Sequence, residues 1–208
     1  MEYPARPPLY QGQHPSHLEE SSFMSERYQL DPAHTVIGFK AKHLAVTNVR
    51  GNFQKFEGWV EADRNNPDSL TGEVTVDIAS LTTNNEQRDG HLKSGDFFEA
   101  ESHPQAVYRP TRGEQLGANN FKVYGDLTIR GVTKELVLDV TVADEIDHPY
   151  QPGSKIVSLE ATGSLNRKDF GLNWDGLAGT IPLASNEIKL EIDSELVRTA
   201  QTADAATV

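Results

Sequence analysis

Residues 121–142 read FKVYGDLTIRGVTKELVLDVTV, and this stretch decides the fold. Apolar residues or glycine hold every odd position from Phe121 to Ile129, and polar residues or tyrosine alternate with them. In the second half, apolar residues hold the even positions from Leu136 to Val142. A period of two is the pattern of a strand with one buried and one solvated face. The connection is so short that it requires antiparallel pairing. The stretch therefore predicts two neighbouring antiparallel strands.

The same alternation recurs from Thr35 onward and is broken by turn-forming residues. It is clear in Val74, Val76 and Ile78 and in Ile188, Leu190 and Ile192, with turns at residues 65–68, 117–120 and 148–153. The pattern predicts about eight long strands, and closing them would leave no exposed edge. The predicted fold class is all-β: an antiparallel eight-stranded barrel with one short helix near one end. An open sandwich is the alternative, although the large aromatic residues favour a barrel, which is either filled or holds one ligand.

A single helix is predicted between the strands. Thr83 and Glu86 have the spacing of a capping box, which starts a helix. Gly95 can take a positive φ after the last turn and so end it. The paired Phe97 and Phe98 follow directly. We expect this segment to close one end of the sheet and to contain, or to cover, the functional site.

Composition excludes several functions. The chain has 208 residues and a formal net charge of −12, which argues against nucleic-acid binding because phosphates require a basic surface. It has no cysteine, so disulfides and thiolate nucleophiles are excluded. The histidines lack metal-ligand spacing, and no catalytic serine or phosphate-binding glycine motif is present. We therefore expect no metal site, no cofactor and no enzyme activity.

The two ends of the chain differ from the rest in composition. Residues 1–24 are rich in Pro, Gln, His and Ser and lack the basic segment and apolar run of a signal peptide. No apolar stretch has the length needed to span a bilayer. We expect a disordered extension at residues 1–24, a barrel domain at residues 25–198 and a flexible tail at residues 199–208. The expected location is cytoplasmic, and the protein is not expected to be membrane-spanning.

Two polar residues are candidates for contact with a ligand. His43 shares the apolar face of its strand with Phe39, so it is either a half-buried imidazole bonded to a carbonyl or a polar group that faces a lumen. Arg88, in the predicted helix, is either a solvated arginine or a fork that binds phosphate or carboxylate. The residues alone leave both alternatives open.

Taken together, several ordered motifs resemble the YceI-like family of polyisoprenoid-binding proteins. The resemblance covers Arg27 to Val197 and rests on residues 30–35, 39–44, 49–53, 88–98, 125–134 and 167–171, which include RDGHLKSGDFF and GDLTIRGVTK. It implies a lipocalin-like barrel with a long isoprenoid chain inside it, and often a homodimer. Members are frequently exported behind a signal peptide, and this sequence departs from that pattern.

We hypothesise that the protein carries, stores or senses an isoprenoid or fatty amphiphile in the barrel lumen. The expected lining is Phe39, Trp59, Phe97, Phe98, Leu127, Ile129 and Trp174, and the expected polar end is His43, Arg88 and His91. A second hypothesis is an enzyme that acts on an amphiphilic ester, phosphate or isoprenoid with His43 or His91 as general base. A third is a filled barrel that acts as a stress or interaction protein.

Overall fold

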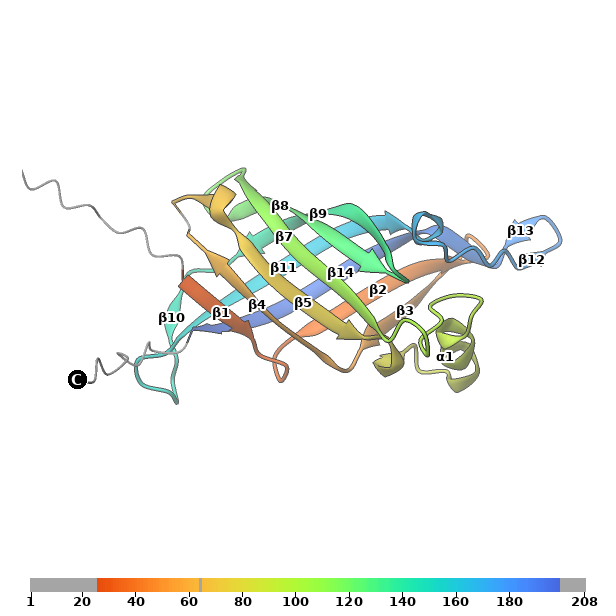
Figure 1. The fold of residues 1–208 in the computed structure, drawn as a ribbon, viewed down its shortest axis with the longest axis horizontal. Helices are drawn as coiled ribbons and strands as arrows, with labels where there is room; N and C mark the ends of the chain where they lie inside the picture. The colour runs from red at the N-terminus through yellow and green to blue at the C-terminus, as the bar shows by residue number, and fades with distance from the viewer. Residues whose placement is uncertain (1–25, 64, 199–208) are drawn as a thin grey trace, which may run out of the picture.

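The computed structural model describes residues 26–63 and 65–198, which form a barrel with a helix at one end (Figure 1). The predicted extension at residues 1–24 and the predicted tail at residues 199–208 lie outside the described residues. The strands are β1 (Glu26–Leu30), β2 (Val36–His43), β3 (Thr47–Phe53), β4 (Phe56–Ala62), β5 (Thr71–Asp77), β6 (Leu81–Thr82), β7 (Gln105–Gln115), β8 (Asn120–Ile129), β9 (Val132–Val142), β10 (Ile146–Asp147), β11 (Lys155–Asn166), β12 (Leu177–Ala178), β13 (Ile181–Pro182) and β14 (Ala184–Arg198). The helical segments are α1 (Glu86–Lys93) and the short 3-10 turns η1 (Pro67–Ser69), η2 (Ile78–Ser80) and η3 (Arg167–Phe170).

Eight strands pair in a closed ring. Their order is β1, β4, β5, β7, β8, β9, β11 and β14, and the pairing of β14 with β1 closes the ring. Every pair in it is antiparallel. The predicted eight-stranded antiparallel barrel is confirmed.

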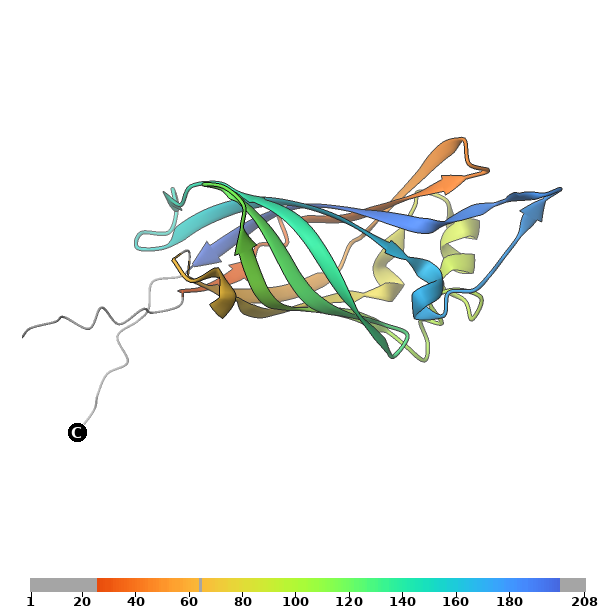
Figure 2. The ribbon, with the colours of Figure 1, turned by 90° about the horizontal axis from the view of Figure 1, so that it is seen from above.

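The barrel wall continues beyond this ring toward α1 (Figure 2). Strand β14 pairs with β1 at its C-terminal end and with β2 from Asp193 back to Ala184. Strands β1 and β2 therefore follow one path that is interrupted at residues 31–35. Strands β3 and β4 pair with β2 and β1 in turn, so they form a second interrupted path. The longer wall gives the barrel an interior that runs well past the eight-stranded ring.

The β8–β9 hairpin shows how the alternating sequence becomes an apolar interior. Phe121 lies opposite Val140 and Val123 lies opposite Leu138, so the odd positions of β8 and the even positions of β9 share one face. The turn takes positive φ at Arg130 (50°) and Gly131 (72°), which matches the twist of a two-residue hairpin. The sequence prediction that the odd positions of β8 and the even positions of β9 form the apolar faces of their strands is confirmed.

Helix α1 has different caps from those that the sequence predicts. Its N-cap is Asn85, whose side chain accepts a hydrogen bond from the Arg88 amide at 2.9 Å. The helix ends at Lys93, with Ser94 as C-cap, and Gly95 has no positive φ. The capping-box prediction at Thr83 is wrong because the Thr83 hydroxyl is bonded elsewhere, to Arg88 and to a buried aspartate.

That aspartate, Asp89, fixes α1 to the end of β6. Its carboxylate accepts hydrogen bonds from the Thr83 amide at 2.8 Å and from the hydroxyls of Thr82 and Thr83. Burial raises the pKa of Asp89, but these hydrogen bonds and the charge of Lys93 outweigh it, so the pKa lies below its ordinary value. The anchored carboxylate therefore stays ionised and holds the helix at the mouth of the barrel.

Candidate functional site

A cavity of about 1180 Å³ runs along the inside of the barrel. Pockets for drug-sized ligands have volumes of roughly 300–1,000 Å³, so this one suits a larger molecule. Its walls come from every strand of the ring, and from β2, β3, α1 and η3 as well. The interior of the described barrel is therefore hollow, which argues against the filled-barrel hypothesis.

The middle of the cavity is apolar because strands present alternate residues to it. Six of the seven apolar residues that the sequence analysis selected do line it: Phe39, Phe97, Phe98, Leu127, Ile129 and Trp174. The ring of Phe53 packs against the rings of Phe39 and Phe98, and its centroid lies 5.7 Å from the first and 6.4 Å from the second. Even positions of β9 and β14 complete the wall, from Leu136 to Val142 and from Ile188 to Leu196.

Trp59 is the exception, and its predicted place in the lining is wrong. It lies in β4, where Val60 and Ala62 face the cavity. Because neighbouring residues of a strand point to opposite faces, Trp59 points outward. There its ring lies 3.7 Å from the guanidinium carbon of Arg27 on β1, in a cation–π contact.

Two histidines line the cavity at the α1 end. His43 donates from Nδ1 to the carbonyl oxygen of Leu183 at 2.8 Å, since a carbonyl can only accept. His91 has its Nε2 2.8 Å from a carboxylate oxygen of Asp96 and packs edge-on against Phe97 and Trp174. The other nitrogen of each ring is left to accept a hydrogen bond from a ligand, or to donate one when the ring is protonated.

Arginine side chains add positive charge at the same end. Arg88 lines the cavity and donates from Nε and Nη2 to the hydroxyl and carbonyl of Thr83 at 2.7 and 2.9 Å. These bonds orient the guanidinium and leave its Nη1 donors for another acceptor. Together with Lys42, which also lines the cavity, His43, Arg88 and His91 form a mouth that suits an anionic or hydroxyl-bearing group.

Arg167 is a functional candidate that the sequence analysis did not select. It lines the cavity but is only 4% exposed, and it donates to the carbonyls of Leu172 and Ser185 and to Asp175. Three acceptors satisfy it, two from the segment before β12 and one from β14, so its first role is to hold these parts of the mouth together. The sequence could have pointed to Arg167 through the motif at residues 167–171, of which it is the first residue. Its hydrogen-bond partners could not be inferred, because the fold brings them together.

The opposite end of the cavity is acidic. Glu26, Tyr28, Asp63 and Glu145 line it there. The Tyr28 hydroxyl lies 2.8 Å from carboxylate oxygens of both Glu26 and Glu145, and Arg198 forms ion pairs with the same two carboxylates at 3.0 and 3.1 Å. Burial, followed by hydrogen bonds to these carboxylates, raises the pKa of Tyr28. The hydroxyl therefore stays protonated and donates within a hydrogen-bonded network at this end of the cavity.

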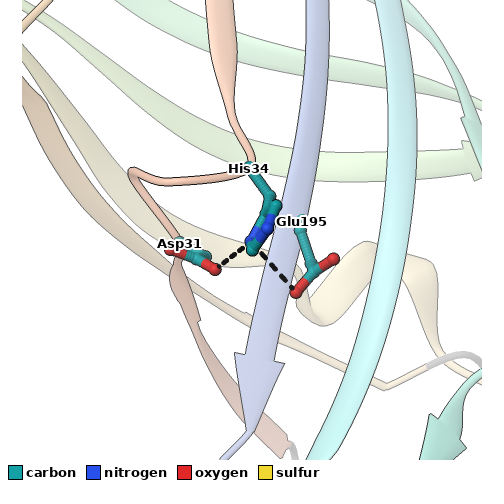
Figure 3. A group of neighbouring side chains, drawn as sticks. All are labelled: Asp31, His34 and Glu195. Atoms are coloured by element: carbon teal, nitrogen blue, oxygen red, sulfur yellow. Dashed lines mark hydrogen bonds and ion pairs between the residues drawn. The ribbon is translucent and has the colours of Figure 1, made fainter. Parts of the chain in front are cut away.

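Asp31, His34 and Glu195 form a cluster outside the cavity, where the β1–β2 path bends against β14 (Figure 3). The His34 Nδ1 lies 2.7 Å from Asp31 Oδ2 and 3.8 Å from Glu195 Oε1. The three ligand atoms lie within 4.8 Å of one another, close enough to hold a metal ion. The contacts already explain the cluster as a brace for the bend, and the sequence-based expectation of no metal site stays a prediction.

We expect His34→Ala to lower the free energy of unfolding more at about pH 5 than at about pH 8. The hydrogen bond to Asp31 and the charge of Glu195 raise the pKa of His34, so its stabilisation is full below the unfolded pKa and is lost as pH rises. The bond from His34 also lowers the pKa of Asp31, so this contribution fades only in strong acid. Urea unfolding at both pH values measures the difference. An equal loss at both would contradict a protonated His34.

Comparison with known proteins assigns the family. The chain matches the model of the YceI-like domain over residues 28–196. The chain belongs to the YceI-like family. Relatives of this YceI-like chain include a UPF0312 protein of Photorhabdus laumondii, 36% identical over 76% of this chain and 82% of that protein. UPF0312 proteins of Staphylococcus aureus are 34% identical over 81% of this chain and 95% of theirs.

Solved structures share the YceI-like barrel. BcnA of Burkholderia cenocepacia aligns with a TM-score of 0.69 at 22% identity, over 82% of this chain and 99% of that one. A YCEI protein of Campylobacter jejuni aligns with a TM-score of 0.64 at 30% identity, over 74% and 87%. A polyisoprenoid binding domain of Saccharophagus degradans aligns with a TM-score of 0.57 at 15% identity, over 82% of this chain and 98% of that one.

No helix in the described ranges is long and apolar enough to cross a bilayer.

Proposed function

We propose that this protein binds a long-chain isoprenoid or a similar amphiphilic lipid inside the barrel. The observation that carries the proposal is the hollow, apolar interior of about 1180 Å³. Membership of the YceI-like family supports it, as does the barrel shared with the polyisoprenoid binding domain of Saccharophagus degradans. In this proposal the protein carries, stores or senses the lipid.

Burial of the hydrocarbon chain supplies the affinity. Removing several hundred Å² of apolar surface from water is worth on the order of 10 kcal/mol at about 25 cal/mol per Å², before the cost of association is subtracted. Micromolar binding therefore needs no contact to the headgroup. Polar groups at the mouth then set the orientation of the lipid and select its headgroup.

The two ends of the cavity differ in charge, and this difference supports one orientation. Lys42, Arg88 and Arg167 lie at the α1 end, and Glu26, Asp63 and Glu145 lie at the other. Arg167 is paired with Asp175, and Arg198 pairs with Glu26 and Glu145, so the difference comes mainly from Lys42 and Arg88 at one end and from Asp63 and the excess of carboxylates over Arg198 at the other. A phosphate or carboxylate is attracted to the first end and repelled by the second. The polar end of the lipid is therefore placed at α1, with the chain extending toward Tyr28.

We expect Arg88→Gln to weaken binding of a long-chain prenyl phosphate by about 10- to 100-fold, the value of one or two charged hydrogen bonds. Binding of the corresponding uncharged prenol should change little, because its chain contacts are intact. Displacement of a fluorescent lipid measures both affinities. Lys93→Gln removes the same charge from the same helix at a residue outside the cavity lining and serves as control. Equal losses for phosphate and prenol would contradict the assigned headgroup position.

Binding is favoured over catalysis by what surrounds the two histidines. Among the described residues that line the cavity, Ser194 is the only serine or threonine, and its hydroxyl is bonded to Thr35 at 2.9 Å in the middle of the barrel wall. Neither His43 nor His91 therefore has a hydroxyl nucleophile beside it in the lining, as nucleophilic catalysis would require. The enzyme hypothesis would regain support from turnover of a prenyl pyrophosphate that is lost in His43→Ala.

Lipid extraction from the purified full chain, followed by mass identification, tests the proposed function directly. We expect a co-purifying isoprenoid or fatty amphiphile, visible as a mass shift in native mass spectrometry. A protein that neither retains lipid nor takes up added polyprenyl lipids would contradict the proposal. The cytoplasmic location and the homodimer stay predictions, which fractionation of cells and light scattering can test.

A further inference from the structure

Two hairpins extend beyond the ring of eight strands at the α1 end (Figures 1 and 2). One joins β2 to β3 and has residues 44–46 at its tip, and the other is formed by β12 and β13. The first hairpin is bonded near its tip to the base of the second, because the Leu44 amide and His43 Nδ1 both donate to the Leu183 carbonyl. Because His43 and Leu183 also line the cavity, the paired hairpins extend directly from its mouth.

The tips of these hairpins are apolar and exposed. Val46 is 75% exposed, Leu177 60% and Ile181 47%. No charged residue occurs among residues 44–46 or 176–184. The nearest acidic residue before the second hairpin, Asp175, is paired with Arg167 and Lys168. An exposed, uncharged apolar group of this kind is typical of a surface that contacts a protein partner or a membrane.

The backbone of the first tip provides an independent observation. Leu44 and Ala45 both take positive φ, at 51° and 58°, and the Val46 amide donates to the His43 carbonyl at 3.0 Å. Such a turn strongly prefers Asn-Gly, because other residues are strained at positive φ. Apolar side chains occupy the tip despite this strain, and strain of this kind clusters at functional sites.

We propose that the two hairpin tips insert into the surface of a lipid bilayer and place the cavity mouth against the membrane. Apolar side chains without charge suit the acyl boundary of a bilayer. The acidic residues Glu26, Asp63 and Glu145 lie at the opposite end of the cavity, so repulsion from anionic headgroups favours docking by the hairpin end. A lipid could then pass between bilayer and cavity without crossing water. The docking itself does not depend on what the cavity holds.

Flotation of the full chain with phosphatidylcholine vesicles tests this inference. We expect the wild type to float, and Val46→Asp combined with Ile181→Asp to reduce the bound fraction about tenfold or more, because two inserted side chains are lost. Leu44→Asn combined with Ala45→Gly should also reduce it while raising the melting temperature, since the turn strain is relieved. Leu116→Asp combined with Ile146→Asp changes equally exposed residues, 57% and 58%, away from the hairpins and serves as the matched control.

Several results would overturn the proposal. These are a wild type that does not float, hairpin variants that float as well as the wild type, or a control variant that loses binding to the same extent. A homodimer that the hairpin substitutions dissociate without vesicles would assign the tips to a second copy of the chain, which also overturns it. Native mass spectrometry of the hairpin variants separates this inference from the proposed function, because they should still retain lipid in the cavity.

Discussion

Ala161→Trp is expected to abolish lipid retention while leaving the fold intact. Ala161 lies in β11, is 3% exposed and lines the cavity between Val140 on β9 and Ile192 on β14. An indole at this position fills space that a hydrocarbon chain must occupy, and the hollow interior can accept the added volume. The co-purifying lipid should disappear from the native mass spectrum, and displacement assays should show at least about a hundredfold weaker binding.

Thr162→Trp is the matched control for this substitution. Thr162 is the next residue of the same strand and is exposed, because alternate residues point to opposite faces. The control should retain lipid as the wild type does. Should Ala161→Trp bind lipid normally while folded, the ligand would lie somewhere other than the barrel interior. Circular dichroism and thermal unfolding of both variants exclude loss of structure as the explanation.

The second large effect is expected from Arg167→Met, which should lower the free energy of unfolding by about 3 kcal/mol. The substitution keeps much of the side-chain volume but removes the donors to Leu172, Ser185 and Asp175. The two carbonyls are then left without this partner in a part-buried place. Because η3 and the segment before β12 are held through these bonds, the cavity mouth should also loosen. Urea unfolding measures the first effect and hydrogen exchange the second.

Lys168→Met provides the comparison for the arginine. Lys168 is the next residue and pairs with the same Asp175 at 2.6 Å, but its side chain is partly exposed. Exposed ion pairs contribute about 0–1 kcal/mol, so the loss should be small. Similar losses for Lys168→Met and Arg167→Met would show that the buried carbonyl bonds contribute little.

The sequence was sufficient for the barrel and for most of its lining. Alternation in β2 and β8 specifies which residues face inward, since a period of two allows only one apolar face. Phe39, His43, Leu127 and Ile129 were placed in this way, and the structure confirms that all four line the cavity. Their role in binding lipid stays a prediction.

Other features depend on tertiary partners that no local pattern specifies. In β4 the adjacent Trp59 and Val60 are both apolar, so alternation there does not show which one faces inward. Pairing with β1 places the Arg27 side chain on the outer face beside Trp59. The cap of α1 was misassigned for a related reason, because Thr83 is bonded to Asp89 across the β6–α1 junction. The Tyr28 network joins residues that are 117 positions apart in the chain, which the sequence could not indicate.

In the proposed function, the bonded acidic network described above limits the length of chain that the barrel accepts. Each methylene that enters the apolar interior adds up to about 0.8 kcal/mol, so affinity for a homologous series of lipids should rise steadily at first. The rise should stop when the tail reaches Tyr28, Glu26 and Glu145, because further growth would displace bonded carboxylates rather than empty space. We therefore expect the distance between the two ends of the cavity to discriminate between short and long homologues, without direct recognition of an isoprene unit by the described residues that line it.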